Sequence, residues 1–392
     1  MEEDKRLAMA RTWAEINLDA LENNVNILKG LLTNGAKFLG VCKANAYGHG
    51  MVQIAKKLQE LKIDMIAVAS IQEGIELRKN GIILPILCFG QSNPDLTDLI
   101  IKYDITQTVE NLEFGKLFSK KALENGKEKM KVHVKIDTGM GRIGFFWPKE
   151  GDCNQEEKNS TSNEISELFK LEGLEIEGIF THFADADNKE FTHSQIKKFN
   201  EVLEYMKKKG INFKIAHAAA SVGVYKYPEA HFSMGRFGLI FYGYTSTETG
   251  NIDSDLKLIP LMTLKSRIST IRNLPKGTSV SYGCTYELKR DSVIAVLPIG
   301  YADGFPRCLS NNANVKIHNK LLPILGRVCM DMVMVDVTDV KEEVKAGDIA
   351  IVLDEELAIE NAKNANTIIH ELLSQILSRV NRVYINKGKM SL

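Results

Sequence analysis

The sequence predicts an α/β protein, in which a (β/α)8 TIM-type barrel is followed by a mostly β domain. Between residues 37 and 243, eight short runs rich in Val and Ile alternate with segments of helical periodicity, as in parallel strands linked by helices. From about residue 256, short strands are separated by Gly, Pro and Asn. We therefore expect a barrel domain over residues 12–250 and a β domain over residues 256–392, with residues 1–11 packing against the latter.

Two amphipathic helices frame the expected barrel. Residues 18–32 open with Asp19 and Glu22 at capping-box-like spacing, and residues 194–210 keep helical spacing until Gly210. An open doubly wound sheet is the competing fold, but no GxGxxG turn follows the first strand. The expected barrel strands lie in KFLGVCK, MIAVAS, PILCFG, ITQTV, KVHVKID, EIEGIFTHF, FKIAHAAAS and RFGLIFYG.

Beyond the barrel, the pattern becomes that of β structure. Residues 149–165 have almost no large apolar side chain, so we expect an exposed, mobile insertion between the fifth and sixth strands. The strands of the second domain are expected in LKSRISTI, SVIAVLPIG, ANVKIHN, VMVDVTD and DIAIVLD.

Composition excludes several classes of function. Fifty basic and fifty acidic side chains cancel, so no bulk field favours nucleic acid or an anionic membrane. The N-terminus is acidic and polar, unlike a signal peptide, and no apolar run reaches the ~18 residues of a membrane span. We expect a soluble, cytoplasmic protein.

The six cysteines predict no metal site. They are scattered, and none has CxxC or Cys/His ligand spacing, so we expect mostly buried thiols and no structural zinc. They are Cys42, Cys88, Cys153, Cys284, Cys308 and Cys329.

Chemistry is expected where the barrel strands end. The first strand ends at Lys43, whose amine, if buried, would lose its charge and could form a Schiff base with a carbonyl cofactor. A lysine that extends its amine to solvent is the common alternative. Where barrels commonly bind phosphate, the seventh and eighth strands end in His217, Ser221, Arg236 and Gly238.

The ends of the fifth and sixth strands add further candidates. Lys135, Asp137 and Arg142 lie beside three glycines, which let the backbone approach a ligand closely. Arg142 suits a carboxylate clamp, although a surface ion pair would also explain it. His182 follows the sixth strand, where a buried core histidine is the ordinary interpretation.

Eight blocks, in order along the chain, resemble those of the alanine racemase family. The resemblance runs from about residue 12 to residue 385. It implies a barrel that carries pyridoxal 5'-phosphate (PLP) and a head-to-tail homodimer with shared active sites. It also implies interconversion of L-alanine and D-alanine for peptidoglycan. The blocks are KANAYGHG, KIDTGMGRIG, THFADAD, HAAAS, MGRFGLIFYG, SYGCTY, PIGYADG and GRVCMD.

The resemblance also implies a role for each residue at the cofactor. Lys43 would hold PLP as a Schiff base, and His182 would stack near the ring. Arg236, supported by His217, would face the pyridine nitrogen and keep it unprotonated. The phosphate would be held by Tyr47, Ser221, Gly238, Leu239 and Tyr384.

Racemisation needs a base on each face of the substrate. By resemblance, Lys43 would act on D-alanine and Tyr282, from the other subunit, on L-alanine. Arg142 would bind the substrate carboxylate, oriented by Lys135 as an N6-carboxylysine. Tyr301 and Met330 would narrow the pocket around a methyl group.

Three alternative functions use a similar barrel, and the residues disfavour the second and the third. A serine or broader racemase is compatible with the same residues, because an apolar pocket rejects an added hydroxyl only about a hundredfold. PLP-dependent decarboxylases place an acid where this chain has Arg236, and non-enzymatic PLP-binding proteins lack the domain that carries Tyr282. Ala220 and Asn381 depart from the asparagine and proline usual in the family.

Overall fold

The computed structural model describes residues 2–126, 129–148, 155–245 and 256–392. Contacts divide the chain into two compact units. The barrel unit comprises Val25–Ala44 and Met51–Phe241, and the sheet unit comprises Met1–Asn24, Asn45–Gly50 and Tyr242–Leu392.

The barrel unit contains the eight expected strands, all parallel and neighbours in chain order. The last strand pairs with the first, Arg236 opposite Leu39. The seventh and eighth strands meet through the bonds Ser233 N–H to Ala216 O (2.9 Å) and Arg236 N–H to Ala219 O (3.2 Å), which bring the circle near closure. The strands are β2 (Lys37–Val41), β3 (Met65–Val68), β4 (Ile86–Cys88), β5 (Ile105–Val109), β6 (Met130–Asp137), β8 (Leu174–Phe180), β9 (Ile215–His217) and β10 (Met234–Phe237), with β7 (Phe145–Phe146) beside β6.

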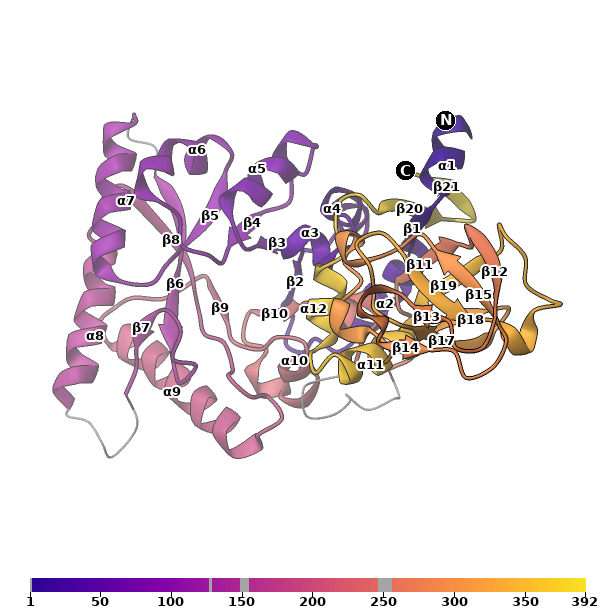
Figure 1. Ribbon diagram of the computed structural model, residues 1–392. Coiled ribbons are helices and arrows are strands. Elements are labelled where there is room, and N and C mark those ends of the chain that lie inside the picture. The colour runs from indigo at the N-terminus through magenta and orange to yellow at the C-terminus, as the bar shows by residue number, and fades with distance from the viewer. Residues whose placement is uncertain (1, 127–128, 149–154, 246–255) are drawn as a thin grey trace. The chain divides into compact units, whose positions relative to one another are not determined.

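Helices lie outside these strands, as α7, α8 and α9 show in Figure 1. They present apolar faces to the strands and polar faces outward. The helices are α4 (Met51–Glu60), α5 (Ile71–Lys79), α6 (Thr97–Lys102), α7 (Leu112–Glu124), α8 (Gln155–Leu168), α9 (Lys189–Lys208) and α10 (Val222–Lys226), with short 3₁₀ turns η1 (Pro94–Leu96), η2 (Pro228–Ala230) and η3 (Leu239–Tyr242).

Three local predictions differ from the structure. The helix predicted over residues 18–32, α2 (Leu18–Lys29), is capped by Asn17. Its Oδ1 accepts from the backbone N–H groups of residues 19 and 20 at 3.0 Å each, so Asp19 is not the cap. The helix predicted over 194–210 begins earlier, at Lys189, because Asn188 caps it. The run RFGLIFYG is strand only to Phe237, since an apolar run does not by itself distinguish a strand from a buried turn.

Residues 155–165 are mostly exposed, as expected, but they form most of α8 rather than a mobile insertion; residues 149–154 lie outside the described part of the chain. Ser162, Ile165 and Leu168 are buried at helical spacing. A methyl group on Gly115 of α7 would lie 2.3 Å from Leu168, so the two helices pack closely there. The apolar side chains that decide this packing are Ile165, at the end of the polar segment 149–165, and Leu168, beyond it.

The sheet unit is built on ten strands in the order β12-β15-β18-β17-β16-β19-β11-β1-β20-β21, in which the five expected β-domain segments all form strands. The strands are β1 (Thr12–Asn17), β11 (Met262–Arg267), β12 (Thr270–Leu274), β15 (Ser292–Leu297), β16 (Asn314–Ile317), β17 (Lys320–Leu325), β18 (Val333–Asp336), β19 (Ile349–Leu353), β20 (Asn381–Asn386) and β21 (Lys389–Ser391); β13 (Ser279–Val280) pairs with β14 (Tyr286–Glu287). Short helices complete the unit: α1 (Glu2–Ala8), α11 (Glu355–Asn364), α12 (Ile369–Ser374), η4 (Tyr282–Cys284), η5 (Tyr301–Asp303), η6 (Arg307–Leu309) and η7 (Thr338–Val340).

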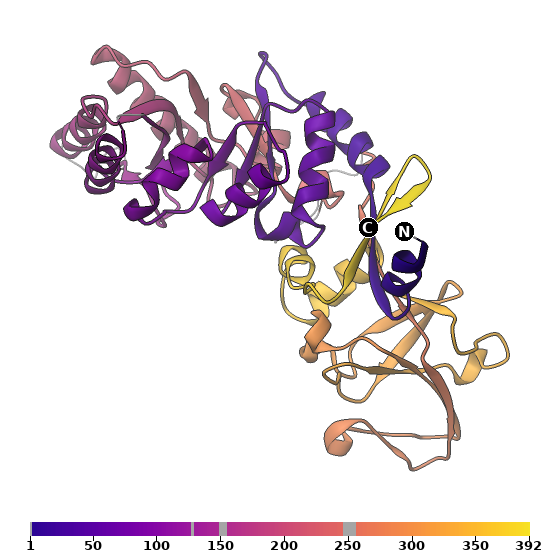
Figure 2. The same cartoon turned by 90° about the horizontal axis from the view of Figure 1, so that it is seen from above.

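The first strand, β1, belongs to this sheet, antiparallel to β11 and parallel to β20. Residues 12–24, 45–50 and 242–245, which the sequence placed with the barrel, therefore belong to the sheet unit. The two ends of the chain lie close together in this unit (Figure 1, Figure 2).

The thiols are less buried than expected. Cys42 and Cys88 are buried, whereas Cys284 and Cys308 are exposed because they stand in polar turns; Cys153 lies outside the described residues. In the described part of the chain, no group of three or more His, Cys, Asp or Glu side chains could hold a metal ion. No helix of the described ranges is long and apolar enough to cross a membrane.

A buried carboxylate anchors the sheet unit. Asp303, 1% exposed, accepts hydrogen bonds from both terminal nitrogens of Arg11 at 2.7 and 2.6 Å and from the Gly300 N–H at 2.9 Å. It also forms an ion pair with Arg379, whose Nε lies 3.1 Å from Asp303 Oδ1. Arg11 thereby ties the start of β1 to the loop that carries Tyr301.

We expect Arg11→Ala to lower the free energy of unfolding of the sheet unit by about 2–3 kcal/mol, because the buried carboxylate loses two charge-assisted hydrogen bonds and keeps only the Gly300 N–H and the ion pair with Arg379. Arg290→Ala is the matched control: it removes an equally bidentate pair with Asp339, but one that is exposed, and should change nothing measurable. The two tryptophans allow the measurement, since Trp13 lies in the sheet unit and Trp147 in the barrel unit. Urea unfolding followed by Trp13 fluorescence in a Trp147→Phe background reports the sheet unit; equal shifts in both variants would contradict the anchor.

Candidate active site

Lys43 stands at the end of β2 and opens α3 (Lys43–Tyr47). From Ala44 to Tyr47, φ lies between +50° and +54°, so these four residues form a left-handed turn without glycine. Such a conformation costs roughly 1–2 kcal/mol per residue. It persists only where neighbouring groups impose it, and it is typical of functional sites.

Glu73 imposes one end of this turn. Its Oε1 accepts the Ala44 N–H at 2.7 Å, and its Oε2 accepts the Ala69 N–H at 2.7 Å. The same carboxylate forms a capping box with Ser70 at the start of α5. Glu73 therefore joins the residue after Lys43 to the N-terminus of α5.

Cationic side chains converge around His182, at the carboxyl ends of the barrel strands. Burial and the nearby cations Arg236, Arg142, Lys135 and Lys43 hold the pKa of His182 well below its ordinary value, so the imidazole is neutral. Because each of these four cations acts on the same imidazole, they gather at one end of the barrel. This end of the barrel therefore favours the binding of anionic groups.

The two lysines of this cluster have depressed pKa values. Burial lowers the pKa of Lys43, Arg142 adds to the effect, and Glu73 opposes it. Burial, followed by the charge of Arg236, lowers the pKa of Lys135 to about 7. Lys135 is 2% exposed and donates to Ile136 O at 2.7 Å. A substantial fraction of Lys135 is therefore a neutral amine at neutral pH.

Arg142 is carried by a loop that Asp137 organises. The Asp137 carboxylate accepts the backbone N–H groups of Gly139, Met140 and Gly141 at 2.8–2.9 Å. Gly139 and Gly141 have positive φ, which explains their place in the loop. The charge of Asp137 is thus used to shape the loop.

Arg236 is a buried cation, 2% exposed. Its Nη2 donates to the carbonyls of Thr181 (2.9 Å) and Ala218 (2.6 Å) and lies 2.9 Å from His182 Nδ1; its Nη1 lies 2.9 Å from His217 Nδ1. Burial lowers the pKa of Arg236 to about 9, which leaves the guanidinium charged at neutral pH.

Ser221, Gly238 and Leu239 lie together where β9 and β10 end. Ser221 Oγ accepts the Gly238 N–H at 3.3 Å, and Leu239 begins η3 directly after it. Ser221 has φ of 27° and precedes the short helix α10. Loops after the seventh and eighth strands, with a short extra helix, are where such barrels bind phosphate.

Tyr47 and Tyr384 both belong to the sheet unit, where Tyr384 lies against Gly50. A methyl group on Gly50 would lie 1.8 Å from Tyr384 Oη, so only glycine fits there. Burial raises the pKa of Tyr384 to about 12, which keeps its hydroxyl protonated as a donor. His49 Nδ1 donates at 2.9 Å to the carbonyls of Ala46 and Tyr47 and so supports the left-handed turn.

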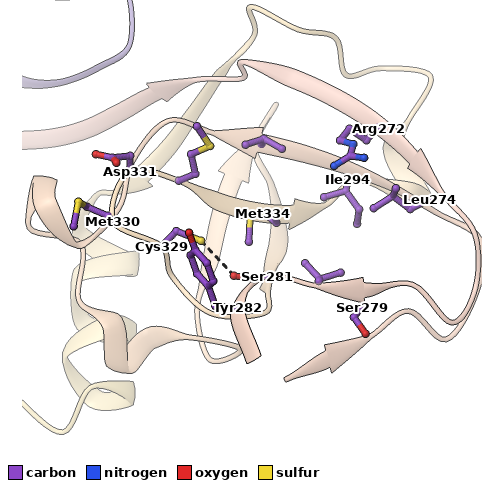
Figure 3. A pocket seen from close by; sticks show the side chains of 13 residues that line it. Arg272, Leu274, Ser279, Ser281, Tyr282, Ile294, Cys329, Met330, Asp331 and Met334 are labelled. Atoms are coloured by element: carbon purple, nitrogen blue, oxygen red, sulfur yellow. Dashed lines mark hydrogen bonds between the residues drawn. The ribbon is translucent and has the colours of Figure 1, made fainter. Parts of the chain in front are cut away.

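Tyr282 lies at a pocket of about 560 Å³ in the sheet unit, with Cys329 and Met330 among its lining residues (Figure 3). Its side chain is 70% exposed. The Tyr301 N–H donates to Cys329 O at 3.0 Å, which places Tyr301 beside the same loop. Ser281 Oγ lies 3.3 Å from Cys329 Sγ, the contact dashed in Figure 3.

The residues expected from the sequence thus fall into three groups. The barrel unit brings together Lys43, Lys135, Arg142, His182, His217, Ser221, Arg236, Gly238 and Leu239. Within the sheet unit, Tyr384 lies against Gly50, three residues after Tyr47, and Tyr282, Tyr301 and Met330 form another group. Sequence reasoning missed Glu73, although the capping-box spacing of Ser70 and Glu73 could have drawn attention to it.

Models of the two alanine racemase domains match almost the whole chain. The model described as "Alanine racemase, N-terminal domain" matches residues 16–246, and "Alanine racemase, C-terminal domain" matches residues 261–384. The chain belongs to the alanine racemase family.

Individual alanine racemases are similar over nearly full length. That of Methanococcus maripaludis is 41% identical over 381 residues, 95% of this chain and 98% of its own. The solved alanine racemase of Clostridium difficile 630 is 41% identical with a TM-score of 0.90, covering 97% of each chain. That of Streptomyces lavendulae is 30% identical with a TM-score of 0.87, covering 96% of this chain and 97% of that one. This member of the alanine racemase family is therefore an enzyme with the family's fold.

For this alanine racemase family member, we expect Glu73→Ala to speed amide hydrogen exchange at Ala44 by about tenfold or more, because the N–H loses its carboxylate acceptor and the strained turn loses a restraint. The measurement is hydrogen exchange with mass-spectrometric detection of peptides over residues 40–50. Glu76→Ala, an exposed carboxylate on the same helix, is the control and should leave exchange unchanged. Equal acceleration in both variants would assign the effect to fraying of α5 instead.

Proposed function

We propose that this enzyme interconverts L-alanine and D-alanine with PLP bound in the barrel unit, and that it supplies D-alanine for peptidoglycan. The observation that carries the proposal is the group of four cations around a neutral His182, which includes a lysine of lowered pKa. Such a site suits a phosphorylated carbonyl cofactor together with an amino-acid carboxylate.

The residues present fit the three polar parts of PLP. Lys43 offers an amine of lowered pKa for the aldehyde. Ser221 and the backbone of Gly238 and Leu239, with the hydroxyls of Tyr47 and Tyr384, would hold the phosphate. When bound, the cofactor would supply an electron sink that acidifies the Cα–H bond of the substrate.

Arg236 would face the pyridine nitrogen. Its guanidinium only donates hydrogen bonds and stays charged at neutral pH, so it would leave that nitrogen unprotonated. With Arg236 in this role, a bound cofactor would be a weaker electron sink, which would favour return of the proton to Cα over side reactions. His182 would lie against the cofactor, kept neutral by burial and by the surrounding cations.

Two bases would act on opposite faces of Cα. Lys43 would move the proton of D-alanine, and Tyr282 of the partner subunit that of L-alanine. The high exposure of Tyr282 supports a role toward a second copy of the chain. Arg142 would bind the substrate carboxylate, while Tyr301 and Met330 would limit the room beside the methyl group. We therefore propose a homodimer with shared sites.

Lys135 would carry a carbamate. The lone pair of the neutral amine would form an N–C bond to CO₂ as one C=O π pair moves onto oxygen, and the N–H bond would break to release one proton to solvent. The product is an anion where a protonated Lys135 would face the positive charges of Arg236 and Arg142. The change would replace repulsion by attraction and orient Arg142.

The function is tested by racemisation assays on alanine, serine and lysine with PLP present. We expect alanine to be the best substrate and Lys43→Ala to lose both activity and the absorbance of covalently bound cofactor. Activity on serine equal to that on alanine would favour a broader racemase. An unchanged cofactor spectrum in Lys43→Ala would overturn the assignment of the lysine.

The shared site is tested by mixing Lys43→Ala with Tyr282→Phe. If each site takes one residue from each subunit, a mixed dimer has one intact site and should recover up to about half of wild-type activity. Activity is followed against mixing ratio, with heterodimers counted by native mass spectrometry. Inactive heterodimers that still bind PLP would exclude a shared site.

The proposed carbamate gives a pH dependence. Only the neutral amine adds CO₂, so at constant dissolved CO₂ the fraction of Lys135 that carries the carbamate should rise with pH through about 7. At one pH unit below the pKa, only about one-tenth of the amine is neutral. The measurement is a ¹³C NMR signal after exchange with ¹³CO₂, compared between pH 6 and 8. A signal that survives in Lys135→Ala, or that falls as pH rises, would contradict the proposal.

A further inference from the structure

A further buried imidazole, that of His133, extends the hydrogen bonds of Arg236 into the barrel. His133, on β6, is 0% exposed, and its Nδ1 lies 3.1 Å from Nε2 of His217. The other ring nitrogen of His217 lies 2.9 Å from Arg236 Nη1. Among the described residues, His133 Nε2 has no hydrogen-bond partner. A chain of contacts thus runs from Arg236 through His217 to His133 and ends there.

Arginine fixes the direction of this chain. A guanidinium donates and does not accept, so Nδ1 of His217 must hold a lone pair. Because burial holds the pKa of His217 well below its ordinary value, the ring is neutral and carries its proton on Nε2. That proton is donated to Nδ1 of His133, whose own proton must then lie on Nε2. Both imidazoles are therefore restricted to a single tautomer.

The backbone makes room for His133 in this position. Gly178 on β8 is its register partner, and β8 stands between the strands of His133 and His217. A methyl group on Gly178 would lie 2.7–2.9 Å from three atoms of the His133 ring, closer than real contacts allow. On the next position of β8 with the same orientation, Phe180 stacks on His217 at 4.8 Å with 6° between the rings. Gly178 thus allows His133 to reach across β8.

We propose that His133 is a positioning residue for Arg236: by accepting from His217 Nε2, it holds His217 in the one tautomer and orientation that accepts from the guanidinium. The role of Arg236 toward the cofactor rests on the proposed function. The hydrogen-bond chain does not, because it is made by described side chains of the barrel unit alone.

Loss of His133 would leave the His217 N–H without an acceptor in the barrel interior. The ring could then turn or change tautomer, and a proton on Nδ1 would face a guanidinium that can only donate. Arg236 would lose that acceptor while keeping the carbonyls of Thr181 and Ala218. We expect a misplaced guanidinium in a protein that is otherwise folded.

The direct test is ¹⁵N NMR of full-length protein labelled at its eight histidines, which distinguishes protonated from unprotonated ring nitrogens. In the wild type, His217 and His133 should both carry the proton on Nε2, with or without PLP. A proton on Nδ1 of His217 would overturn the proposal. This measurement is independent of racemase activity, so its outcome is separate from that of the proposed function.

Two substitutions at one position separate positioning from packing. His133→Leu removes the acceptor, and we expect His217 to show both tautomers and kcat to fall about tenfold with KM changed less than twofold. His133→Asn keeps an acceptor oxygen near the place of Nδ1 and should restore the wild-type tautomer and most of kcat. If both variants behaved alike, or if His133→Leu left His217 and kcat unchanged, the proposal would be wrong.

Gly178→Ala provides a second route that keeps the histidine. The added methyl group should displace the His133 ring and reproduce the mixed tautomers and lowered kcat of His133→Leu. Wild-type His217 signals in a folded Gly178→Ala protein would also count against the proposal.

Discussion

A buried guanidinium governs the barrel end of this enzyme. Arg236 is held by carbonyls and by neutral imidazoles, so its described hydrogen-bond partners are all uncharged. A buried cation in such surroundings repels protons from its neighbours. The neutral state of His182 and His217 and the lowered pKa of Lys135 all follow in part from this charge. Strand ends that would otherwise be ordinary polar loops become a site that favours anions.

Strain supplies the second constraint. The turn after Lys43 is left-handed over four residues, and it is held from the barrel unit by Glu73 and within the sheet unit by His49. The cost of the turn, on the order of several kcal/mol, has to be offset by these and other contacts. A lysine on so restrained a backbone has few directions in which to point its amine, which suits a residue that must reach one atom of a cofactor.

Local chemistry explains what could be predicted from the sequence. The eight strands, Lys43 and the glycine loop before Arg142 each show a short-range pattern, and the order of the blocks along the chain indicated the family. Glu73 and His133 were missed because their roles depend on partners 29 and 84 residues away. The cap at Asn17 and the helix at residues 155–165 were missed for a related reason. Asn17 lies just before the predicted segment 18–32, and part of the packing that fixes the helix lies beyond residue 165.

The position of β1 bears on how the chain folds during synthesis. Trp13 pairs with Asn381 across β1 and β20, so β1 leaves the ribosome long before this neighbour is synthesised. At about 5–20 residues per second, that delay is on the order of 20–70 seconds. The barrel strands, in contrast, pair with their neighbours in chain order as they emerge. For most of synthesis β1 would present an unpaired edge, and its short length of six residues and the acidic Glu15 limit the opportunity for pairing with other chains.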